Sequence, residues 1–132
     1  MTNLPLDFTV GSQNVRLTNE FVLIKYAAGA TVPLTEAKLC TDSMARILNG
    51  KKTPALIDIR NIKSVDREAR IHYAGAATGN IFTAAALLID SPMTKTIGNF
   101  FLGINKPTVP TKLFSSEEEA ISWLKKFPGN VA

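Results

Sequence analysis

Residues 54–66 read PALIDIRNIKSVD, and the fold is decided in this stretch. Its first part is a short apolar run between turn signals, too short for a helix and typical of a central strand buried on both faces. A polar loop follows, after which the apolar spacing predicts a helix from about Val65 to Ala77, ended by Gly79. Asp66 falls in the first turn of this helix, where a carboxylate interacts favourably with the helix dipole. A buried strand that leads into a helix indicates an α/β protein.

The alternation of strands and helices continues on both sides of this stretch. Strands are predicted at 7–17 (with a turn), 20–27, 84–89 and 111–114, and helices at 35–48, 92–104 and 117–127. The order β-β-α-β-α-β-α-β-α predicts a four- or five-stranded mixed, mostly parallel sheet with an antiparallel edge, flanked by four helices. We expect Leu56, Ile57, Leu87 and Leu88 to lie on central strands that are buried on both faces.

Length, composition and charge narrow the class of protein. No linker, repeat or low-complexity segment divides the 132 residues, so one domain is expected. The formal charge of +4 comes from scattered Lys and Arg residues without a basic stripe, so we expect no nucleic-acid partner. The N-terminus lacks the features of a signal peptide, and no apolar run approaches the ~20 residues that span a bilayer. We therefore expect a cytoplasmic chain without stable membrane insertion.

Patterns that support catalysis or cofactor binding are absent from the sequence. One cysteine and one histidine cannot supply a zinc site, and there is no glycine-rich phosphate loop and no Gly-x-Ser-x-Gly motif. Cys40 lies on the predicted inner face of a helix, where a free thiol packs as a small hydrophobe. His72 shares a helix face with Ala69 and Ala76, which indicates a partly buried, hydrogen-bonded histidine and not a general base. We expect no enzyme activity, no cofactor and no metal site.

Polar side chains gather after the strand at 54–59. Strand ends and helix starts share one edge of a parallel sheet, and ligands commonly bind there. We therefore expect a partner or ligand to bind at an edge formed by Asp58, Arg60, Asn61, Ser64, Asp66 and Arg67. The alternative interpretation is a solvated loop that only holds an Asp–Arg pair. Ser64 is also interpreted as the cap of the following helix.

The element order and the strand-loop-Asp66 pattern resemble the SpoIIAA-like, or STAS, domain family. Several segments are similar to small uncharacterised bacterial STAS-like proteins: AAALLIDSP at 84–92, NFFLGINKP at 99–107, PTKLF at 110–114 and EEAISWL at 118–124. The similarity covers nearly the whole chain, so it implies one STAS-like domain over residues 1–132.

The resemblance implies a non-enzymatic regulatory or protein-binding module with an unknown protein partner. In STAS anti-sigma-factor antagonists, the Asp that matches Asp66 is followed by Ser-Ser-Gly, and a partner kinase phosphorylates one of these serines. Arg67, Glu68 and Ala69 stand at these places here, so we expect recognition by charge and shape without a covalent switch. Ser64 is the alternative, displaced acceptor.

Two further expectations complete the set. CRAL-TRIO lipid-binding domains resemble this architecture, so the alternative function is a carrier of a small apolar ligand or lipid; an enzyme ranks third. The helix at 92–104 is apolar on more than one face, which predicts a homodimer. Its apolar residues are Met93, Ile97, Phe100, Phe101, Leu102 and Ile104.

Overall fold

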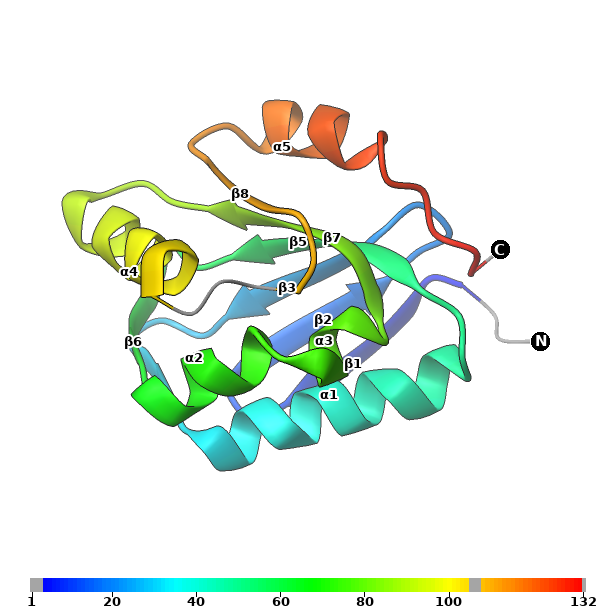
Figure 1. The fold of residues 1–132 in the computed structure, drawn as a ribbon, viewed down its shortest axis with the longest axis horizontal. Coiled ribbons are helices and arrows are strands. Elements are labelled where there is room, and N and C mark those ends of the chain that lie inside the picture. The colour runs from blue at the N-terminus through cyan, green and yellow to red at the C-terminus, as the bar shows by residue number, and fades with distance from the viewer. Residues whose placement is uncertain (1–3, 105–107, 132) are drawn as a thin grey trace.

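A six-stranded sheet lies at the centre of the computed structural model, which describes residues 4–104 and 108–131, without the side chains of residues 100, 101, 103 and 104. Its strands are β1 (Leu6–Val10), β2 (Gln13–Leu17), β3 (Val22–Tyr26), β5 (Thr53–Asp58), β7 (Phe82–Leu88) and β8 (Thr111–Phe114). They are ordered β1-β2-β3-β5-β7-β8, antiparallel from β1 to β3 and parallel from β3 to β8 (Figure 1). The predicted fold class, a mixed and mostly parallel α/β sheet, is confirmed.

The sheet has six strands where the sequence predicted four or five, because residues 7–17 form two strands of a hairpin. Gly11 turns the chain between β1 and β2 with φ +57°, and its missing side chain leaves room for the Glu36 carboxylate. That carboxylate accepts hydrogen bonds from the backbone N–H and the hydroxyl of Ser12, both at 2.8 Å. A separate two-stranded sheet pairs β4 (Ala30–Val32) with β6 (Ile62–Val65).

Helices cover both faces of the central sheet. α1 (Leu34–Leu48), α2 (Arg67–Tyr73) and α3 (Ala76–Gly79) lie on one face, and α5 (Glu117–Leu124) lies on the other (Figure 1). α4 (Pro92–Ile104) lies beside the ends of the parallel strands and contacts β6 and β8. Within the described residues, no helix combines the length and the apolar character needed to cross a bilayer.

The helix predicted from Val65 to Ala77 is divided into α2 and α3. The break follows Ala74, and Gly75 has an extended backbone with φ −92° and ψ −169°. Thr108 stabilises the break, because its backbone N–H donates to the Ala74 carbonyl at 3.1 Å and its hydroxyl donates to the Gly75 carbonyl at 2.9 Å. The predicted cap is also corrected: Ser64 lies in β6, and Asp66 occupies the N-cap position of α2.

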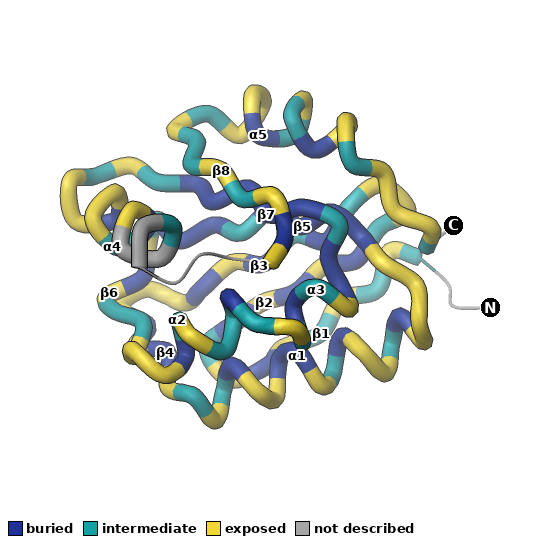
Figure 2. Tube along the Cα trace, viewed as in Figure 1, coloured by how far each residue is buried: buried dark blue, intermediate teal, exposed yellow. Residues whose placement is uncertain are grey.

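β5 and β7 are buried along nearly their whole length (Figure 2). Their two faces belong to two hydrophobic clusters. Leu56 and Leu88 are 1% and 0% exposed and pack with α5, while Leu87 is 7% exposed on the opposite face, so these three predictions are confirmed. Ile57 is only half-buried, which corrects the fourth. Its side chain faces the same way as Leu87, and both border a cavity.

Candidate functional site

A mainly apolar cavity of about 80 Å³ lies between the central sheet and the helices α1, α2, α3 and α4. Ile24 of β3, Ile57 of β5 and Leu87 of β7 line it from the sheet. Ile97 of α4 and Val65 of β6 line it from the sides. Ile57, Val65 and Ile97 are each half-buried, so the cavity is partly open to solvent.

Small residues explain why the cavity remains unfilled. Ala85 of β7 lines it and extends only a methyl group toward it. On α4, a Cβ at Gly98 would lie 2.6 Å from Cδ2 of Leu113, so the helix packs closely against β8 at this glycine. α4 therefore packs against the edge strand β8, and the cavity remains next to β3 and β5.

Part of the cavity wall is polar, and this part includes Gln13. Gln13 Nε2 donates to the Tyr73 hydroxyl at 3.0 Å and to Glu36 Oε2 at 3.2 Å. A carboxylate only accepts hydrogen bonds, so Glu36 fixes which end of the Gln13 amide faces it. Gln13 is fully buried, and its Oε1 accepts no hydrogen bond from the described residues.

The thiol and the two phenol groups of the cavity wall are held in their neutral forms. Burial raises the pKa of the Cys40 thiol to about 11. Burial also raises the pKa of Tyr26 and Tyr73 well above the ordinary tyrosine value. A protonated, buried thiol is a poor nucleophile, so this wall offers hydrogen bonds and apolar contact more readily than covalent chemistry.

Cys40 and His72 take the packing roles that the sequence predicts. Cys40 is 2% exposed on the inner face of α1 and also lines the cavity. His72 is half-buried, and its Nε2 lies 2.8 Å from Thr41 Oγ1.

The first two residues of the predicted edge form a tight ion pair. Asp58 is 5% exposed at the end of β5, and Arg60 donates to it from Nε at 2.9 Å and from a terminal nitrogen at 2.8 Å. Burial acts to raise the pKa of the Asp58 carboxyl, but hydrogen bonds from the Arg60 guanidinium and backbone N–H outweigh it and hold this pKa below its usual value. The Asp–Arg pair of the alternative interpretation is thus present.

The remaining edge residues lie along one segment. Asn61, Asp66 and Arg67 are exposed, while Ser64 is half-buried within β6. Between them, Ile62 and Val65 line the cavity. The structure therefore brings the predicted edge and the cavity together on opposite sides of residues 61–67; binding at the edge stays a prediction.

The cavity is the feature that sequence reasoning missed, although Gln13 carried a signal. β2 alternates buried and exposed residues, and Gln13 shares its buried side with Val15 and Leu17. A polar residue at an inward position of such a strand requires a hydrogen-bonding partner inside the protein.

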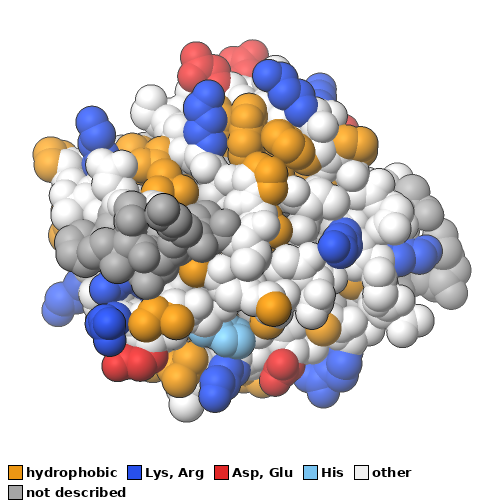
Figure 3. All heavy atoms as spheres, viewed as in Figure 1, with side chains coloured by type: hydrophobic (Ala, Val, Ile, Leu, Met, Phe, Trp, Pro, Cys, Tyr) orange, Lys and Arg blue, Asp and Glu red, His pale blue; other side chains and the backbone are white. Residues whose placement is uncertain are grey.

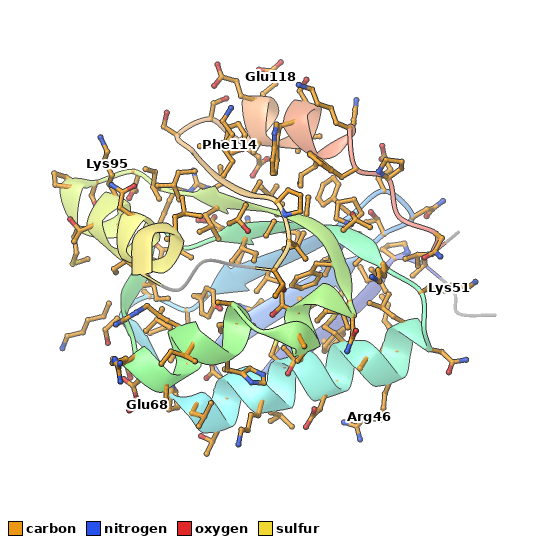
Figure 4. The ribbon with its side chains drawn as sticks, viewed as in Figure 1. Arg46, Lys51, Glu68, Lys95, Phe114 and Glu118 are labelled. Atoms are coloured by element: carbon orange, nitrogen blue, oxygen red, sulfur yellow. The ribbon has the colours of Figure 1, made fainter. Side chains whose placement is uncertain are left out.

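Charged side chains do not single out another site on the surface in view. Arg46, Lys51, Glu68, Lys95 and Glu118 point outward from different elements (Figure 4). Lys and Arg side chains are scattered across the face in Figure 3. The apolar residues behind the predicted homodimer divide: Met93 is 53% exposed and Ile97 lines the cavity, whereas the side chains of Phe100, Phe101 and Ile104 lie outside the described residues. The homodimer stays a prediction, which light scattering over a range of concentrations would check.

A family model for a domain of unknown function, DUF7793, matches residues 15–128. The chain belongs to the DUF7793 family. The match extends from β2 to the residues after α5 and includes most of the cavity wall, although Gln13 precedes it. No curated protein matches the chain.

Solved structures place this DUF7793 chain in a known fold. An uncharacterized protein of the DUF3478 family with a SpoIIAA-like fold, from Shewanella loihica PV-4, is 20% identical with a TM-score of 0.58. The alignment covers 94% of this chain and 98% of that one, which confirms the SpoIIAA-like fold. A protein with unknown function from Arthrobacter sp. FB24 is 30% identical over 79% of this chain and 90% of that one, with a TM-score of 0.30.

Proposed function

We propose that this DUF7793 chain is a non-enzymatic binding module that takes a small apolar molecule into the cavity between the sheet and α4. The cavity is the observation that carries the proposal. Its surface is mainly apolar, with Ile, Val and Leu as the most frequent lining residues. Removing such side chains from contact with water is favourable. A dry, apolar cavity of roughly 150 Å³ in another protein binds benzene. The cavity here has about 80 Å³ and is partly open, so a single ring or a short branched chain would lie partly inside it and partly at its opening.

The chemistry of the wall supports binding over catalysis. Cys40, Tyr26 and Tyr73 remain protonated at neutral pH. Glu36 is occupied by hydrogen bonds from Ser12 and Gln13. Among the described residues, no group of three His, Cys, Asp or Glu side chains is arranged to hold a metal ion.

A regulatory role is the second part of the proposal, and the shared segment 61–67 favours it. Ile62 and Val65 touch the cavity, while Asn61, Asp66 and Arg67 face solvent on the same segment. A ligand that shifts Ile62 or Val65 would shift these polar side chains as well. Such a change would be read by a protein partner that recognises charge and shape at the edge.

Binding of toluene tests the cavity directly. Saturation-transfer NMR should detect toluene bound to the purified protein with a Kd on the order of 1 mM, because a small ligand offers few contacts. Ile57→Phe places extra volume at the cavity wall and should weaken toluene binding several-fold. Ile47→Phe is the matched control, because Ile47 is also half-buried but does not line the cavity. Equal toluene signals from both variants, or none from the native protein, would contradict the proposal.

A further inference from the structure

We infer that the molecule in the cavity carries a neutral hydrogen-bond donor, most simply a hydroxyl on an apolar ring or chain, which donates to Oε1 of Gln13. This inference rests on the proposed function and adds the polar half of the ligand. It starts from the unusual position of Gln13, a fully buried amide on a strand whose other inward residues are apolar.

The orientation of the Gln13 amide decides which polar group is required. Its Nε2 has two partners, the Glu36 carboxylate and the Tyr73 hydroxyl. Reversing the amide would place Oε1 against a carboxylate that can only accept, which is unfavourable. Oε1 is therefore the end that lacks a partner among the described residues.

A buried acceptor without a partner costs about 1–3 kcal/mol, so native proteins usually satisfy it. Gln13 lines the cavity, so a molecule there lies next to this side chain. Because Gln13 is 0% exposed, a neighbouring side chain has to shift for the donor of that molecule to reach Oε1. An acceptor such as an ether or ketone would not satisfy Oε1, but a hydroxyl would.

The donor should be neutral. An ammonium group would have to leave water for a cavity with a mainly apolar surface, which costs several kcal/mol without a matched anion. The nearby carboxylate, Glu36, already accepts from the Ser12 backbone, the Ser12 hydroxyl and Gln13. A hydroxyl keeps the apolar contacts and avoids this desolvation cost.

Phenol and toluene form the deciding pair of probes, because they have nearly the same shape and differ in the donor. A wholly apolar cavity prefers toluene, since phenol must give up its hydrogen bond to water. A cavity that contains an unpaired hydrogen-bond acceptor prefers phenol instead. We expect phenol to bind at least about fivefold tighter than toluene. Phenol should also shift the side-chain amide resonance of Gln13, with toluene shifting it far less.

Two variants locate the acceptor. Gln13→Met keeps a long side chain without the carbonyl and should remove the preference for phenol while toluene still binds. Thr78→Val is the control, because the Thr78 hydroxyl is another buried cavity group without a partner among the described residues. It should leave the preference unchanged. If Gln13→Met does not fold, the amide shift in the native protein still decides the assignment.

The outcomes separate the two proposals. Toluene binding as tight as or tighter than phenol would overturn the inference and leave the apolar cavity intact, as would loss of the phenol preference in Thr78→Val alone. Failure of both probes to bind would overturn the proposed function itself.

Discussion

On one face of β7, Ala84 and Ala86 pack in a cluster with Ala120 of α5, whereas on the other face Ala85 borders the cavity. Alanine thus has opposite effects on the two faces of β7. On one face it allows α5 to approach closely, and on the other face it leaves space for the cavity. On the first face, α5 packs over β5 and β7. Its Trp123 ring packs between Phe114 and Phe127 in tilted arrangements, at centroid distances of 5.6 and 4.9 Å. On the second face, α4 leans toward β8 through Gly98.

The difference shows that the alanine residues of β7 do not by themselves produce the cavity. The position of the helix that covers each face also decides whether space remains. Each face can be changed without altering the other, because successive side chains of a strand point to opposite sides. The following variants exploit that independence.

The largest effect is expected at the centre of the α5 face. Leu88→Asp would place an unpaired carboxylate at a position that is 0% exposed and cost about 3–5 kcal/mol, much of the stability of an ordinary domain. We expect loss of soluble, cooperatively folded protein, measured by yield and by circular dichroism during heating. Leu39→Asp is the control, because Leu39 is 51% exposed and should tolerate the charge. A Leu88→Asp protein that melts like the native one would remove β7 from the core.

Two alanine variants test the comparison itself. Ala86→Leu would force extra volume between β7 and α5, where Ala86 is 0% exposed, and should destabilise the protein by about 2–3 kcal/mol. Ala85→Leu would extend into the cavity and should range from neutral to stabilising by about 1 kcal/mol. Urea unfolding would measure both, and Ala85→Leu should also reduce toluene binding. Equal destabilisation by the two variants would mean that the faces do not differ in packing.

The ion pair at the end of β5 gives a smaller, pH-dependent effect on the α5 face. Arg60→Met would leave the buried Asp58 carboxylate without its guanidinium partner and should cost about 1 kcal/mol at pH 7, discounted because the Arg60 side chain is 35% exposed.

The sign of the pH dependence follows from the pKa of Asp58. In the native protein this pKa is lowered, so the stabilisation is present above the unfolded value of about 4 and is lost as pH falls through the folded value. Without Arg60, burial raises the pKa and protonation relieves the cost. The difference in unfolding free energy between native protein and Arg60→Met should therefore shrink between pH 7 and pH 3.

Arg16→Met is the matched control for that measurement. Arg16 pairs with Asp7 at 3.1 Å, but both side chains are more than half exposed. Its removal should change stability by less than about 0.5 kcal/mol at either pH. A pH-independent loss in Arg60→Met would show that packing, and not the ion pair, is responsible.

The fold could be predicted where a residue pattern has only one physical solution. The run at 54–59 is too short for a helix and too apolar for a surface, which placed it correctly as the central strand β5. The start of the second helix was predicted at about Val65 for a similarly local reason, and α2 begins two residues later, at Arg67. Such features depend on a few neighbouring residues, so the sequence reports them directly.

The cavity depends on contacts between distant residues, and no local pattern reports those. Gly98 meets Leu113, and Thr108 holds the break after Ala74, so the position of α4 and the division of the second helix are set by tertiary packing. The apolar run at 54–59 predicts full burial of Ile57. In the structure Ile57 is half-buried, because it borders the cavity. Gln13 is the sequence signal for the cavity, because it is a polar residue at an inward position of β2. Interpreting this signal requires knowing which groups surround Gln13 in the fold.

The smallest effect on stability is expected at Arg67, outside both clusters. Arg67→Glu reverses an exposed charge at the first residue of α2 and should change the unfolding free energy by less than about 0.5 kcal/mol. If residues 61–67 form a recognition edge, the same change should weaken capture of a partner from a lysate of the native host, because it alters the local charge by two units.

Phosphorylation provides the independent test of that edge. Ser64 lies half-buried in β6, where its backbone pairs with Thr31 of β4, so modification would have to disturb the small sheet. We expect no gain of phosphate when the protein is incubated with ATP and host lysate and its intact mass is measured, and Ser64→Ala should behave identically. A stoichiometric single phosphate that disappears in Ser64→Ala would establish a covalent switch in place of recognition by charge and shape alone.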